Sequence, residues 1–115
     1  MKQRVSCCSR VVAGVILAAC LSAPAHAQRQ VISGEELAVW LSQAGESGRG
    51  AFAGFVLGVH DAFNEIMFCT SREVSASQIE RAVSGFLNTH PELLYKSGAD
   101  LVREALAGVF PCRKE

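Results

Sequence analysis

The chain has 115 residues, half of them hydrophobic, with 11 basic and 11 acidic residues and a formal net charge of zero. This length suits one small domain. The basic residues are scattered, whereas nucleic-acid binding draws its affinity from clustered Lys and Arg side chains, so we expect no nucleic-acid partner.

The N-terminal segment is typical of a secretory signal. Basic residues precede an apolar run over residues 11–21, and small residues follow it up to Ala27. As a helix this run would rise only about 16 Å, against roughly 30 Å of hydrocarbon in a bilayer. We therefore expect a signal peptide over residues 1–27, a periplasmic domain over residues 28–115, and no membrane insertion after cleavage.

A second processing site competes with this one. Residues 17–20 read Leu-Ala-Ala-Cys, which resembles the lipobox of bacterial lipoproteins, in which Cys20 would be acylated and the chain tethered to a membrane. Residues 25–27 read Ala-His-Ala, and cleavage there would free a soluble chain that starts at Gln28. We favour the soluble form, because the small residues after Cys20 are otherwise unexplained, and keep the lipoprotein as the alternative.

The exported domain would be acidic and hold one cysteine pair. Cleavage removes three of the 11 basic residues and no acidic one, which leaves 8 against 11 and a net charge of about −3. Three of the five cysteines also leave with the signal, and the remaining pair is Cys69 and Cys112. A lone pair in an exported domain predicts a disulfide, which would close a loop of about 44 residues and stabilise the fold by roughly 4 kcal/mol.

The first two helices are expected before Cys69. Ser33 and Glu36 form a capping box that opens a first helix, and the polar residues 46–50 end it. The second helix is expected to run nearly 17 residues and to end at Cys69. Its buried face should hold the apolar residues that recur at helical spacing: Phe52, Phe55, Val56, Val59, Phe63, Ile66 and Met67.

Two further helices and a short turn are expected after Cys69. A capping box at Ser75 and Gln78 opens the third helix, which stops before Pro91. Pro91 suits the first position of a short helical turn, and Ser97 can cap a final helix that ends near Phe110. No segment alternates as a strand does. The sequence therefore predicts an all-α fold, a small four- to five-helix bundle stabilised by one disulfide.

Small residues recur at every fourth position of the second helix, at Gly50, Gly54, Gly58 and Ala62. A glycine inside a helix costs about 0.5–1 kcal/mol relative to alanine, so a compensating close contact is expected. We interpret the series as a packing ridge, either against another helix of the chain or against a second copy in a homodimer. A groove that receives a partner's loop is the alternative.

Polar residues occupy the other side of this helix, and two polar loops flank the helices. Together they supply the expected partner-binding residues: His60, Asp61, Asn64, Glu65, Arg72 and Glu73. A metal site would need more converging ligands, so we expect neither metal nor cofactor. No serine lies in a nucleophile frame and no triad is recognisable, so we do not expect an enzyme.

Several motifs together resemble the Rap/Tai-type immunity proteins, small periplasmic helical proteins of Gram-negative bacteria. They are the glycine segment 54–62, Phe68-Cys69, the His-Pro-Glu at 90–92, and the stretch 101–112 that ends at Cys112. The resemblance covers residues 50–112. It implies a helical, often dimeric protein that blocks the active-site cleft of a peptidoglycan amidase effector delivered by type VI secretion, by binding and without catalysis.

One departure and two rival functions accompany this resemblance. Many members carry a further cysteine pair, where this chain has Trp40 or Leu41 and Ala53. A small periplasmic acid-stress chaperone is the first rival, which would expose apolar surface as its carboxylates lose their charge on acidification. A lipid-anchored envelope protein is the second, and it rests on Cys20 alone.

Overall fold

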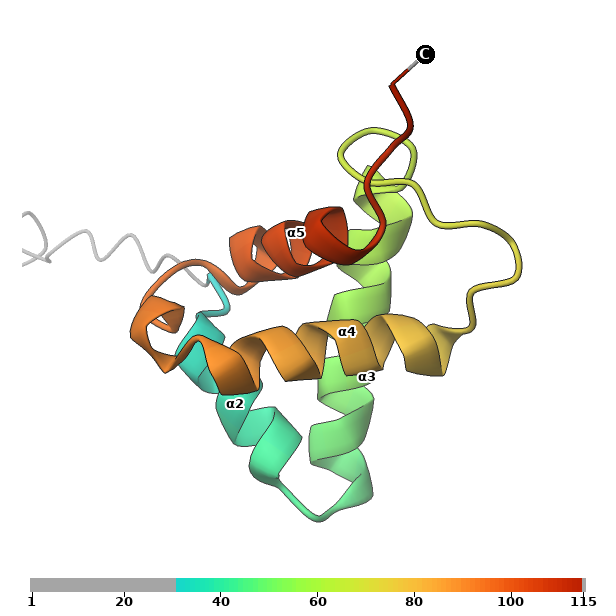
Figure 1. Cartoon of the computed structure of the whole chain (residues 1–115). Helices are drawn as coiled ribbons and strands as arrows, with labels where there is room; N and C mark the ends of the chain where they lie inside the picture. The colour runs from blue at the N-terminus through green and yellow to red at the C-terminus, as the bar shows by residue number, and fades with distance from the viewer. Residues whose placement is uncertain (1–30, 115) are drawn as a thin grey trace, which may run out of the picture.

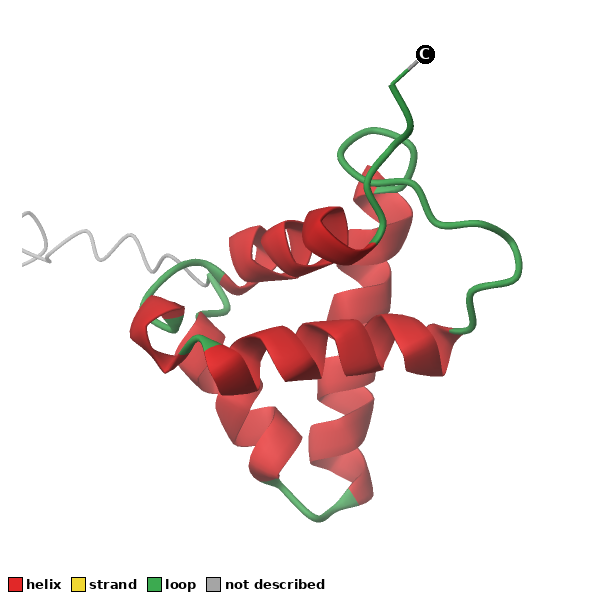
Figure 2. Cartoon of the chain, viewed as in Figure 1, coloured by secondary structure: helices red, strands yellow, loops and turns green. Residues whose placement is uncertain are grey.

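The structure is a computed structural model of the chain, and residues 31–114 are described. Within them all regular structure is helical, and no strand occurs (Figure 2). The elements are α2 (Gly34–Ser42), α3 (Glu46–Phe63), α4 (Ala76–Thr89), the short 3₁₀ helix η1 (Pro91–Leu93) and α5 (Gly98–Val109). The expected all-α fold is confirmed. The predicted signal over residues 1–27 lies outside the described residues.

The helices form two hairpins that cross each other. Helices α2 and α3 make a V, joined at its point by residues 43–45, and α4 and α5 lie side by side across α3 (Figure 1). The short helix η1 connects α4 to α5, and the segment after α5 passes beside the loop that follows α3. Each hairpin therefore covers the apolar side of the other.

Every α-helix contributes to a single core, and removal of this apolar surface from water is the main force that holds such short helices together. No charged or polar residue among the described ones is buried with them. The core residues are Leu37, Phe52, Val56, Phe68, Ile79, Val83, Leu87, Leu101, Val102, Ala105 and Leu106.

Helix α3 begins and ends earlier than the sequence predicted. Gly45 is its N-cap with an extended backbone, and Glu46 lies in the first turn, where the helix dipole favours a negative charge. The polar residues 46–50 therefore start α3 rather than end α2, because their glycines and serine do not break a helix that is held from one side by the core.

At its other end α3 stops at Phe63, so the prediction that the helix continues to Cys69 is wrong. Asn64 leaves the helical region with ψ of 140°, and Glu65 adopts a left-handed backbone with φ of 67°. Ile66 and Met67 were expected in the core but are 74% and 47% exposed. Their helical spacing continues the apolar pattern past the point at which the backbone turns away.

The three predicted caps differ in how complete they are. At α4 the capping box is present: Gln78 N donates to Ser75 Oγ at 3.3 Å, and Ser75 N donates to Gln78 Oε1 at 2.8 Å. At α2 only half of the box forms, with Glu36 N donating to Ser33 Oγ at 3.2 Å. Ser97 is the N-cap residue of α5 but makes no side-chain cap bond.

The starts of α2 and α5 cross in backbone contact, and the first N–H group of each helix donates across the crossing. Gly98 N donates to Ile32 O at 2.7 Å, and Gly34 N donates to Lys96 O at 3.0 Å. A Cβ atom on Gly34 would meet Leu101 and lie 2.7 Å from the carbonyl oxygen of Leu94. On Gly98 it would lie 2.9 Å from Leu37 Cδ1 and 3.0 Å from Ile32 O. Only glycine allows this approach at both positions.

We predict that Gly34→Ala lowers the free energy of unfolding by about 1–3 kcal/mol, because the added methyl group overpacks a site walled by backbone. Gly85→Ala is the matched control, since nothing lies within 4 Å of a Cβ there. It should instead raise stability by about 0.5–1 kcal/mol through helix propensity. Urea unfolding followed by far-UV circular dichroism measures both, and equal effects of the two substitutions would contradict the crossing.

Candidate functional site

The loop over residues 64–70 is fastened to the C-terminal segment. The predicted disulfide between Cys69 and Cys112 is confirmed, with its Cα atoms 4.8 Å apart. Next to it, Cys69 N donates to the carbonyl oxygen of Phe110 at 2.8 Å. The covalent bond and the hydrogen bond together fix the end of this loop against the end of α5.

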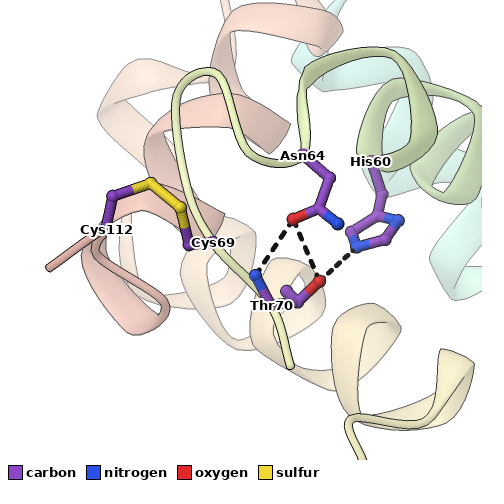
Figure 3. Close-up of a disulfide and its surroundings, with 5 residues drawn as sticks. All are labelled: His60, Asn64, Cys69, Thr70 and Cys112. Atoms are coloured by element: carbon purple, nitrogen blue, oxygen red, sulfur yellow. Dashed lines mark hydrogen bonds between the residues drawn. A yellow bond between two sulfur atoms is a disulfide. The ribbon is translucent and has the colours of Figure 1, made fainter. Parts of the chain in front are cut away.

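On the opposite side of this loop, a hydrogen-bond network ties it back to α3 (Figure 3). Thr70 donates to Asn64 Oδ1 twice, from its backbone N at 3.0 Å and from its hydroxyl at 3.1 Å. The Thr70 hydroxyl oxygen is then left to accept from His60 Nε2, which lies 2.8 Å away. Asn64 therefore ends the helix and also holds the loop that follows it.

His60 and Asp61 differ in their roles although they are neighbours. The His60 side chain is only 13% exposed and its ring lies 5.8 Å from that of the buried Phe68. Asp61 is 82% exposed, and its Oδ1 lies 2.9 Å from His60 Nδ1, which donates to it when the ring is protonated. An ion pair with so exposed a carboxylate adds little stability. The carboxylate is accessible to a partner because most of its side chain faces solvent.

The tip of the loop presents apolar side chains to solvent. Glu65 carries the left-handed backbone there, which costs roughly 1–2 kcal/mol for a residue other than glycine. Beyond it Ile66 and Met67 are exposed. Arg103 of α5 steadies this tip: its Nη1 donates to Met67 Sδ at 3.6 Å, and its guanidinium lies 4.9 Å from the Phe63 ring centre.

The predicted partner-binding residues separate into two groups. His60 and Asn64 are part of the scaffold under the loop, whereas Asp61 and Glu65 are exposed. Arg72 and Glu73 are also exposed, in the connection that leads to α4. Sequence reasoning missed the exposed Ile66 and Met67 as well as Arg103, because a core helix was expected where the tip lies.

Among the helices of residues 31–114, none packs closely against the glycine series, so the expected contact within the chain is not found there. A Cβ atom on Gly50, Gly54 or Gly58 would meet nothing within 4 Å among the described residues. These three glycines and Ala62 are exposed along α3. We call these four residues the small-residue stripe. The close contacts predicted for it belong instead to the crossing of α2 and α5.

A sequence profile of the Rap1a immunity proteins matches residues 16–112. The chain belongs to the Rap1a immunity protein family. Its match spans every described helix and starts inside the predicted export signal. No curated protein sequence matches the chain.

Membership in the Rap1a immunity proteins assigns the chain to proteins that bind a partner effector. In residues 31–114 no three His, Cys, Asp or Glu side chains are grouped as a metal site would require. Among the helices of that region, none has both the length and the hydropathy needed to cross a membrane. The exposed loop over residues 64–70, fastened at both ends, is the feature of this Rap1a protein from which a functional account starts.

We predict that Thr70→Val loosens the loop and lowers the free energy of unfolding by about 1–3 kcal/mol. Valine keeps the shape of threonine but leaves the part-buried Nε2 of His60 without its partner, and Asn64 Oδ1 keeps only the bond from the backbone N of residue 70. Amide hydrogen exchange over residues 64–70 should become faster. Ser71→Ala, at an exposed neighbouring position, should stay within about 0.5 kcal/mol of the wild type. Unchanged exchange in Thr70→Val would show that the network does not hold the loop.

Proposed function

We propose that this Rap1a protein neutralises a peptidoglycan amidase effector of type VI secretion in the periplasm, by inserting the loop over residues 64–70 into the active-site cleft. The observation that carries the proposal is the exposed apolar tip, Ile66 and Met67, on a loop fixed from both sides. The signal expected over residues 1–27 supports a periplasmic location, and the family supports an effector as partner.

The fixed loop suits a role in occlusion for an energetic reason. Binding loses free energy when a flexible segment is ordered, at about 0.5–1.5 kcal/mol for each immobilised side chain. Here the disulfide, the Thr70 bonds and the Arg103 contact order the loop before any partner arrives. A larger part of the free energy gained by burying Ile66 and Met67 would then contribute to the affinity.

Charge around the tip defines the cleft that it fits. Asp61 and Glu65 are exposed near the tip, while Arg103, the basic side chain that contacts it, is paired with Asp100 of α5. A complementary cleft would offer an apolar slot for Ile66 and Met67 and basic or hydrogen-bond-donating groups at its rim. Complementary potentials of this kind raise association rates and reject other partners.

The small-residue stripe supports a homodimer as part of the same proposal. Three glycines weaken α3, and the described part of the chain contains no contact that compensates for them. A second copy that packs on the stripe can approach its backbone closely and supply that contact. The alternative occupant of the stripe is a loop of the partner protein.

We predict that replacing Ile66 and Met67 together by aspartate weakens effector binding by about 100-fold or more, because each apolar anchor of a buried contact is worth about 2 kcal/mol. Calorimetry with a purified peptidoglycan amidase effector of type VI secretion measures the affinity. Growth of cells that send the effector to the periplasm measures protection.

Val39→Asp is the matched control, since Val39 is 53% exposed on α2, away from the loop. It should bind and protect as the wild type does. If the wild-type protein neither binds nor protects, the proposed function is wrong. If the double variant binds as tightly as the wild type, only the role of the loop is wrong.

We further predict that Gly54→Ala with Gly58→Ala separates stability from assembly. In the isolated chain the two methyl groups meet nothing within 4 Å and should raise helix stability by about 1–2 kcal/mol in total. Between two copies the same groups should hold the helices apart and shift the protein toward monomer. Light scattering over a concentration series measures the fraction of dimer. A dimer that persists unchanged would show that the stripe is not part of the dimer contact.

A further inference from the structure

A pocket lies on another part of the molecule, where the end of α2 and the first turns of α3 meet α4. Its volume is about 320 Å³. It shares no residue with the loop over 64–70 or with the small-residue stripe. The residues that matter for its chemistry are Leu41, Phe52, Arg49, Arg81, Glu80 and Ser84.

The pocket combines an apolar floor with a basic rim. Phe52 is 3% exposed and Leu41 is half-buried, so both belong to the core beneath the pocket. Arg49 and Arg81 contribute two positive charges against the single carboxylate of Glu80. The described residues 31–114 as a whole carry 7 basic and 10 acidic residues, a net charge of −3. The pocket thus has a charge opposite in sign to that of the domain around it.

Both guanidinium groups are positioned but lack an anionic partner. Arg81 Nε donates to the carbonyl oxygen of Ser77 at 3.2 Å, and Arg49 Nη2 donates to that of Ala44 at 3.4 Å. Within residues 31–114 neither lies at ion-pair distance from a carboxylate. A guanidinium has five donors in a planar fork that matches a carboxylate, so donors remain available in both side chains.

We propose that this pocket binds the C-terminal residue of a peptide that ends in an apolar side chain. The free carboxylate pairs with Arg49 and Arg81, and the apolar side chain lies on Phe52 and Leu41. Glu80 on the same wall repels an acidic side chain, which gives the site a preference for apolar ends. The volume is at the lower end of the roughly 300–1,000 Å³ of ligand pockets, which suits a short chain end rather than a folded surface.

The probe that tests this site is N-acetyl-Ala-Ala-Leu with a free C-terminal carboxylate, titrated into the ¹⁵N-labelled, disulfide-bonded protein. We expect chemical-shift changes at the amides of Phe52 and Ser84. The same peptide with a C-terminal amide should bind at least ten-fold more weakly, because it lacks the charge-assisted bonds. N-acetyl-Ala-Ala-Glu should also bind more weakly than the leucine peptide.

Variants of the rim complete the test. Arg49→Gln and Arg81→Gln should each weaken binding by about ten-fold, while Arg113→Gln, an exposed arginine outside the pocket, should leave it unchanged. The proposal is overturned if the carboxylate peptide binds more weakly than about 10 mM, if the amide binds equally well, or if sulfate alone competes with equal affinity. The aspartate variant of Ile66 and Met67 should retain peptide binding, so this test is independent of the effector proposal.

Discussion

The disulfide between Cys69 and Cys112 is the constraint on which the arrangement of this protein depends. It joins the loop that follows α3 to the segment that follows α5 across a sequence separation of 43 residues, next to the bond from Cys69 N to Phe110 O. In a domain this small the core alone gives limited stability, so the disulfide contributes a large share of the free energy of unfolding. It also allows a strained, exposed loop at Glu65 to persist where an unfastened chain would relax.

Local signals in the sequence predicted the parts of the fold that local physics determines. The Ser75 capping box and the amphipathic patterns of α4 and α5 depend on neighbouring residues, and they are present as expected. The end of α3 could not be read in this way. It is set by Asn64, whose side chain accepts from Thr70 after the chain has turned, while Ile66 and Met67 prolong the apolar pattern. Periodicity reports which residues are apolar, but not where the backbone leaves the helix.

Contacts between distant segments explain the remaining differences. The sequence shows which positions are glycine, but only the crossing of α2 with α5 shows that Gly34 and Gly98 are the tightly packed ones. In the sequence Arg49 and Arg81 are two isolated basic residues, and the packing of α3 against α4 places both at one pocket. Trp40 packs edge-on against Phe55 with ring centres 6.3 Å apart, so an aromatic contact joins α2 to α3.

The places where this chain departs from good local design follow one another along α3 and the loop after it. Glycines occupy exposed helix positions, a glutamate takes a left-handed backbone, and two large apolar side chains face water. Helices α4 and α5 carry one exposed glycine each, Gly85 and Gly108, against three in α3. Natural sequences tolerate such departures mainly at functional sites and compensate for them elsewhere. Here the disulfide and the glycine crossing stabilise the two ends of the bundle, and this stability compensates for the departures in α3 and its loop.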